Sequence, residues 1–178
     1  AKVKELKTIF IEKDATDLSG GSLTPGDSLR YELSYDNVGN DASTNTRIID
    51  NIPTGTAFKP GSIMIDGISK TDAPGDDEAE YDFTNNRIIF RIGTGANAVT
   101  GGELAAGADG EVSFVVYTPS SCSILACSGT LRNRARMSYG GKLSLQVLQD
   151  SSGVMNSGCI DPVDKLNIVT GPCRQMDD

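Results

Sequence analysis

Leu29-Arg30-Tyr31-Glu32-Leu33-Ser34-Tyr35 is the stretch of sequence that decides the fold. Its apolar residues alternate strictly with polar ones, which is the pattern of a strand with one buried face. Turn residues flank it at 24–27 and 37–40. No window of eleven or more residues carries an apolar stripe of helical period, so we expect an all-β protein.

The same alternation, punctuated by glycine and proline, recurs along the chain. It predicts about nine or ten short strands, which is typical of a β-sandwich. The stretch 66–82 is expected to be irregular and 93–110 to be a glycine-rich loop. The other predicted strands lie at 8–13, 47–52, 58–65, 79–83, 87–92, 111–118, 131–139, 142–148 and 165–169, with hairpins at 84–86 and 140–141.

Composition excludes several classes of protein. The chain has 178 residues, a formal net charge of -8, no histidine and no tryptophan. Without histidine it cannot build a Ser-His-Asp or Cys-His nucleophile pair or an imidazole metal site. The negative net charge disfavours binding to nucleic acid, and no apolar run is long enough to cross a membrane. The length predicts one globular domain.

Four cysteines are present, at Cys122, Cys127, Cys159 and Cys173. A small even number fits disulfides formed in an oxidising compartment. A tetrathiolate metal site is the alternative, but it usually shows paired Cys-x-x-Cys spacing, which is absent. We expect two local disulfides, Cys122–Cys127 and Cys159–Cys173, while crossed pairing and free thiols stay open.

A series of short motifs gives the chain a family resemblance. They are KDATD at 13–17, TPGDSLRY at 24–31, NVGNDA at 37–42, IDNIPTGT at 49–56, KPGS at 59–62, TDAPGDDEAEYD at 71–82 and LRNRA at 131–135. Their order resembles the bacterial conserved-repeat surface domain, which is an immunoglobulin-like β-sandwich with Greek-key connections. The resemblance covers about residues 8–148 and leaves 149–178 as a cysteine-bearing extension of the same domain.

The resemblance implies a structural or adhesive module and not an enzyme. Such domains occur in tandem in secreted or cell-surface proteins of bacteria, so the expected partners are neighbouring repeat domains of the same chain. A surface, host or matrix ligand is a further expected partner, and the isolated module is expected to be a monomer. The alternative is a module that binds carbohydrate or protein, for which the loops 93–107 and 151–158 are the candidates. An enzyme would need a cleft with an acid or base pair, and no pattern indicates one.

Related fimbrial domains form an internal Lys–Asn isopeptide bond, and the resemblance carries their three positions to Lys13, Asp50 and Asn133. The strand phases independently place all three toward the apolar face. Burial favours a neutral lysine nucleophile and a protonated carboxylic acid that polarises the amide. The alternatives are that Asp50 and Asn133 make turn and edge hydrogen bonds, and that Lys13 extends to solvent. Lys7 shares the same phase and is the alternative lysine.

The acidic stretch 66–82 is a candidate calcium loop. Calcium takes six to eight oxygen ligands, and carboxylates at this density can supply them. The spacing is not that of an EF-hand. A solvated acidic loop that protects a sheet edge is the alternative. The candidate ligands are Asp72, Asp76, Asp77, Glu80 and Asp82.

Overall fold

The computed structural model describes residues 9–20, 26–118, 130–131, 133–140, 142–149 and 155–156. Within them every regular element is a strand. The strands are β1 (Ile9–Asp17), β2 (Ser28–Asn37), β3 (Ser43–Asn51), β4 (Ala57–Phe58), β5 (Met64–Ile65), β6 (Ile68–Ser69), β7 (Ala79–Asp82), β8 (Arg87–Arg91), β9 (Gly102–Leu104), β10 (Asp109–Tyr117), β11 (Thr130–Leu131), β12 (Arg134–Tyr139), β13 (Lys142–Gln149) and β14 (Met155–Asn156).

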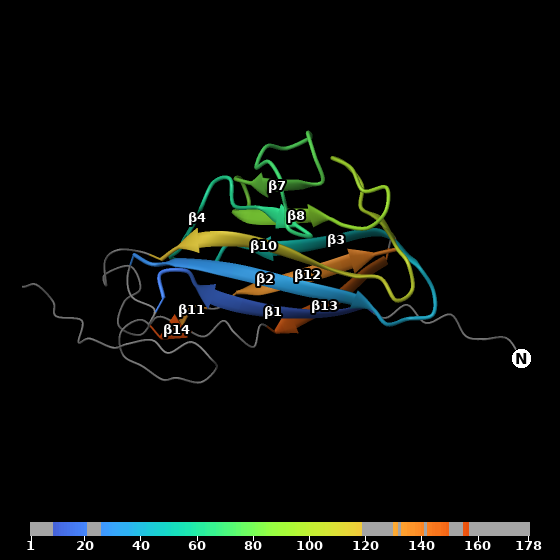
Figure 1. The fold of residues 1–178 in the computed structure, drawn as a ribbon, viewed down its shortest axis with the longest axis horizontal. Helices are drawn as coiled ribbons and strands as arrows, with labels where there is room; N and C mark the ends of the chain where they lie inside the picture. Colours follow the sequence, from blue (N-terminus) through green and yellow to red (C-terminus); the bar gives the residue numbers. More distant parts are fainter. Residues whose placement is uncertain are drawn as a thin grey trace, which may run out of the picture.

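Two antiparallel sheets form a sandwich, which confirms the predicted fold class. The first sheet runs β1-β2-β10-β5-β6, with β4 also paired to β10. The second runs β13-β12-β3-β8-β7, with β9 paired to β3, while β11 and β14 form a separate pair. Figure 1 shows β1, β2 and β10 side by side in one layer, with β3, β12 and β13 in the other.

Strand β2 lies between β1 and β10 in the first sheet and carries the alternation that the sequence shows. Leu29, Tyr31, Leu33 and Tyr35 are all buried, and the polar residues between them point outward. Tyr31 packs on Phe114 of β10 with ring centroids 5.5 Å apart. Such tilted aromatic pairs add about 0.5–1.5 kcal/mol beyond the area that they bury. These rings fill the space between the sheets.

The hairpin predictions at 79–92 and 131–148 are confirmed, because β7 pairs with β8 and β12 pairs with β13. The predicted strand at 58–65 is instead two strands, β4 and β5. Between them Gly61 has φ +72°, a conformation that turns the chain and that side chains rarely adopt. Two predicted irregular stretches also contain short strands, β6 in 66–82 and β9 in 93–110.

The count of nine or ten strands was therefore too low, since fourteen lie in the described residues alone. Several of them have only two residues and are too short to show an alternating pattern. The predicted strand at 165–169 lies outside the described residues.

Candidate functional site

Lys13 lies in the core of the sandwich. It belongs to β1 and is opposite Leu33 of β2, so its side chain shares the inward phase of Ile9 and Ile11. Only 5% of the residue is exposed. Its ammonium nitrogen lies 4.6 Å from the ring centroid of Tyr31 and 5.9 Å from that of Phe114. These ring faces attract a cation but offer it no hydrogen bond.

Asp50 is the ionic partner of Lys13 from the opposite sheet. It is fully buried in β3, and Lys13 Nζ donates a hydrogen bond of 2.6 Å to its Oδ2. The pair therefore joins the two sheets through the core. Removing two charges from water costs several kcal/mol for each ion, so a buried pair is rarely kept for stability alone.

Asn133 is the third buried polar residue and directly precedes β12. It is 2% exposed, and within the described residues neither Oδ1 nor Nδ2 has a hydrogen-bond partner. A buried amide without partners costs about 1–3 kcal/mol for each unsatisfied group. Nearly all buried polar groups in folded proteins are paired, so this amide requires an explanation.

The pairing of β12 with β3 relates Asn133 to Asp50. Ala135 lies directly opposite Asp50, and Asn133 comes two residues before Ala135 on the same side of the chain. Side chains in this diagonal relation stand on one face, roughly 7–8 Å apart at the backbone. The core therefore holds an amine from β1, a carboxylate from β3 and a carboxamide from the residue that precedes β12. Lys7, the alternative lysine, lies outside the described residues, as do Cys122, Cys127, Cys159 and Cys173.

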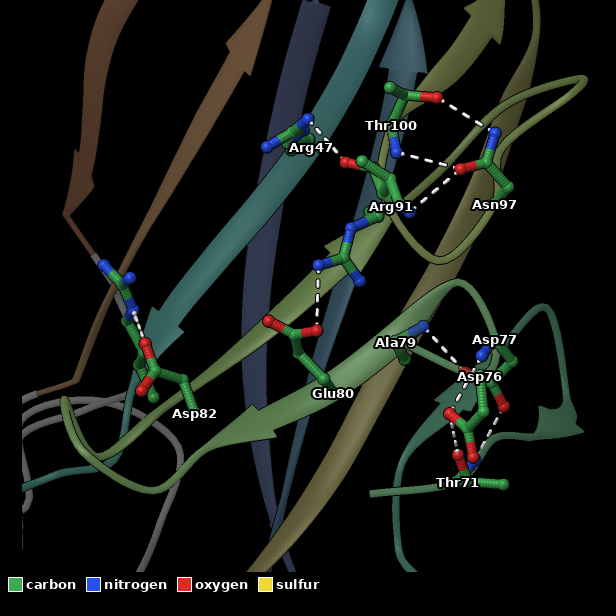
Figure 2. A network of polar contacts seen from close by, with 12 residues as sticks. Arg47, Thr71, Asp76, Asp77, Ala79, Glu80, Asp82, Arg91, Asn97 and Thr100 are labelled. Atoms are coloured by element: carbon green, nitrogen blue, oxygen red, sulfur yellow. Dashed lines mark hydrogen bonds and ion pairs between the residues drawn. The ribbon is translucent and has the colours of Figure 1, made fainter. Parts of the chain in front are cut away.

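The carboxylates of the acidic stretch are bound by separate protein donors. Asp72 accepts a hydrogen bond from the backbone of Gly61, while Asp76 and Asp77 both accept from Thr71. Glu80 pairs with Arg91 at 2.9 Å, and Asp82 with Arg87 at 2.8 Å. Figure 2 shows Asp76 and Asp77 together beside Thr71, apart from Glu80 and from Asp82.

Within the described residues no group of three or more acidic or cysteine side chains converges as a ligand set for a metal ion. The calcium loop therefore stays a prediction, and calcium would have to compete with the donors that hold these carboxylates.

The predicted binding loop 93–107 exposes one large apolar side chain, Val99, which is 70% exposed. The most exposed aromatic residue of the described chain is Phe83, at 82%, and it lies in the turn between β7 and β8. It meets the ring of Tyr81 edge-on at 6.2 Å. A ligand-binding role stays a prediction, and Phe83 is the aromatic that the sequence patterns did not single out. No helix of the described residues is long and apolar enough to span a membrane.

Comparison of the structure with solved structures finds pilin and adhesin domains of bacteria. Three similar structures are the major pilin subunit of Bacillus cereus, the T6 backbone pilin of Streptococcus pyogenes, and the N-terminal domain of a Streptococcus gordonii adhesin. Their TM-scores are 0.51, 0.50 and 0.50, at 9%, 13% and 8% sequence identity. No family model and no curated protein sequence matches the chain.

These likenesses show the fold. The matched region covers 83%, 82% and 83% of this chain but only 39%, 32% and 32% of the three proteins. The chain thus spans well under half of each of these proteins. Its structural neighbours are immunoglobulin-like domains of bacterial pilins and adhesins, as the motif order led us to expect.

Proposed function

We propose that this chain is a non-catalytic structural module of a bacterial surface protein, and that an amide bond between Lys13 and Asn133 locks its two sheets together. The observation that carries the proposal is the buried amide of Asn133, which has no hydrogen-bond partner among the described residues and stands on the same core face as the Lys13–Asp50 pair. A buried amide without hydrogen bonds lowers the stability of the fold. In a cross-linked domain the same amide is the electrophile that the lysine attacks.

The first step of the reaction is a proton transfer within the ion pair. The low dielectric of the core penalises both charges, which favours the neutral amine and the neutral acid. Lys13 Nζ and Asp50 Oδ2 are already at hydrogen-bond distance, so the proton needs no carrier. The freed lone pair of Nζ is then a nucleophile, in the way that desolvation activates lysines elsewhere.

The second step is the exchange of one amide for another. Nζ attacks Cγ of Asn133, and the protonated Asp50 donates to the oxygen on which negative charge develops. The new C–N bond forms while the old one breaks, and the departing nitrogen takes up two protons, one from Asp50 and one that Nζ releases as it becomes the amide nitrogen. The products are a Lys13–Asn133 amide, an ionised Asp50 and one ammonium ion. The bond forms once, so the module is not a catalyst.

Intact mass under reducing conditions tests the cross-link. The wild-type chain should be lighter than its sequence mass by one ammonia, and a protease digest should contain a peptide pair that joins residues 13 and 133. Asp50→Ala and Asn133→Ala should restore the full sequence mass. Lys59→Met, at a half-buried lysine outside the core, should keep the deficit. A wild-type chain of full mass would end the cross-link proposal and leave the structural role standing.

We also propose the location, the partners and the domain extent that fit a structural module. The likeness to pilin and adhesin domains supports a place outside the cell, with neighbouring domains or subunits as the partners. We take residues 1–178 as a single domain with the extension 149–178.

A further inference from the structure

The outward side chains of β1, β2 and β10 form a strongly acidic surface, which we name the acidic face. Strand alternation places them opposite the core residues, and the pairing of the three strands brings them together. Arg30 is the one basic residue among them. The acidic members are Glu12, Asp14, Glu32, Asp36, Asp109 and Glu111.

Like charges are crowded on the acidic face. Asp14 lies directly opposite Glu32, and Asp36 directly opposite Asp109. Directly opposed like charges destabilise a sheet. Burial raises the pKa of Glu111, and the charge of Glu32 and a hydrogen bond with it raise that pKa further, while Arg30 lowers it. This repulsion would be relieved by a cationic surface placed against the face.

The opposite side of the sandwich carries such a surface. The outward side chains of β3, β8 and β12 form what we name the basic face, with Arg47, Arg87, Arg91, Arg134 and Arg136. Glu80 pairs with Arg91 and Asp82 pairs with Arg87, as Figure 2 shows. Within the described residues, positive charge therefore remains in excess on this face of a chain whose net charge is -8.

Arg91 is the most buried arginine of the basic face. It lies directly opposite Arg47 in the pairing of β3 with β8. Only 6% of Arg91 is exposed, yet its Nε and Nη1 have no hydrogen-bond partner in the described residues. These donors are shielded within the chain, so a partner would meet the exposed members of the basic face, Arg134 and Arg136.

The acidic face also holds a hollow that suits an arginine side chain. It has a volume of about 330 Å³ and is lined by Phe10, Glu12, Asp36 and Asp109 among others. Phe10 is 59% exposed, so one ring face is open to a ligand. An arginine side chain suits this combination, because a guanidinium stacks on an aromatic ring and pairs with carboxylates at its edge.

We propose that the partner of these surfaces is a second copy of this chain, with the acidic face of one copy on the basic face of the next. The complementarity lies between two different faces on opposite sides of one molecule. A contact of this kind is heterologous, so it does not close into a dimer and it propagates as a stack. The inference does not depend on the Lys13–Asn133 bond.

The size of the faces sets the expected strength. Three strands of about nine residues cover roughly 30 Å by 15 Å, or about 450 Å² a side. Stable interfaces bury about 800 Å² on each partner. The contact is therefore weak, and the dilute chain is a monomer. Stacking becomes important where many copies are held close together, because local concentration then replaces affinity.

The sign of the salt dependence is the first test. A chain with net charge -8 that lacked complementary faces would repel its copies more strongly as salt is lowered. We expect the reverse: static light scattering should show attraction between copies at about 20 mM salt that disappears at about 500 mM. The chain is measured at high concentration with a calcium chelator present, so that bridging of acidic faces by a metal ion is excluded.

Charge-reversal variants give the decisive test. Glu12→Lys with Glu111→Lys removes most of the negative charge of the acidic face, while Arg134→Glu with Arg136→Glu removes the positive excess of the basic face; all four positions are exposed. Each variant alone should lose the attraction, and an equal mixture of the two should regain it. Phe10→Ser should weaken the attraction without a change in charge. Glu12→Lys alone should also weaken the attraction. Its matched control is Thr54→Lys with Ala106→Lys, which adds the same charge at exposed loop positions outside both faces.

Two outcomes would overturn the proposal. Repulsion between wild-type copies at low salt would show that the faces do not meet. Failure of the mixture to associate, with both variants folded as judged by circular dichroism, would show that any wild-type attraction comes from other surfaces. A basic face that serves an anionic polymer instead would give the second result together with polyanion binding that Arg134→Glu with Arg136→Glu abolishes.

Discussion

Replacement of Asn133 by leucine separates a cross-linked core from a merely ion-paired one by the sign of its effect. Asn133→Leu removes the electrophile, keeps the Lys13–Asp50 pair and puts an apolar side chain of similar size in a buried site. If no bond forms, the change removes an unsatisfied amide from the core and should be neutral or stabilising. If the bond forms in the wild-type chain, the substitution prevents it and the stabilisation that it provides is lost.

The loss in the second case follows from chain entropy. A bond between residues 13 and 133 closes a loop of about 120 residues, and a cross-link of that span stabilises by about 5 kcal/mol in the loop-closure model. For a chain of this size each kcal/mol shifts the melting temperature by about 2–4 °C, so the melting temperature of Asn133→Leu should fall by roughly 10–20 °C.

A second variant guards against an indirect effect of leucine. Lys13→Met with Asp50→Leu removes both charges together, and such replacement of a buried pair is usually neutral or stabilising by up to about 4 kcal/mol. With the cross-link it should instead cost about as much as Asn133→Leu, because both variants cut the same bond.

Equilibrium denaturation in urea measures the free energy of unfolding and the denaturant slope of each variant. The denaturant slope should rise in the two variants, because the unfolded chain without the bond exposes more surface. Two variants that are as stable as the wild type, with unchanged slopes, would refute the argument for a bond at this site.

Two further predictions concern the acidic stretch. The hydrogen bond from Lys70 is the main cause that lowers the pKa of Glu78 below its ordinary 4.5. The pair therefore stabilises the fold above pH 4.5, and this stabilisation is lost as the pH falls through the lower pKa of the folded state. Glu78→Gln should therefore cost about 0.2–1 kcal/mol at pH 7, less in high salt, and nothing in strong acid; an equal cost at every pH would contradict this. Millimolar calcium should leave the melting temperature unchanged relative to chelator, because Asp72, Asp76 and Asp77 already accept protein hydrogen bonds; a clear rise would restore the calcium loop.

Much of the fold could be predicted from alternation. The phase of Leu29 to Tyr35 fixes which side of β2 is buried, and the same reasoning placed Lys13, Asp50 and Asn133 toward the core, where the structure has them. Alternation is informative here because each of these strands has one buried and one solvated face.

Other features depend on tertiary contacts that no local pattern carries. β6 and β9 have two and three residues, and pairing with neighbours across the fold defines them. The density of carboxylates in 66–82 indicated a metal site, but the donors that hold them, such as Gly61 and Arg91, come from other segments. The acidic and basic faces likewise depend on the order of the strands in each sheet, which the sequence does not show.

The far edges of the two sheets bear on how the protein behaves at high density. β6 has two residues and β7 has four, and the acidic stretch runs between them. Edges this short offer little template for pairing with the backbone of another molecule, so aggregation by strand addition is disfavoured there. A surface crowded with copies can then associate through side-chain charges, which salt reverses, without growth of a continuous intermolecular sheet from these edges.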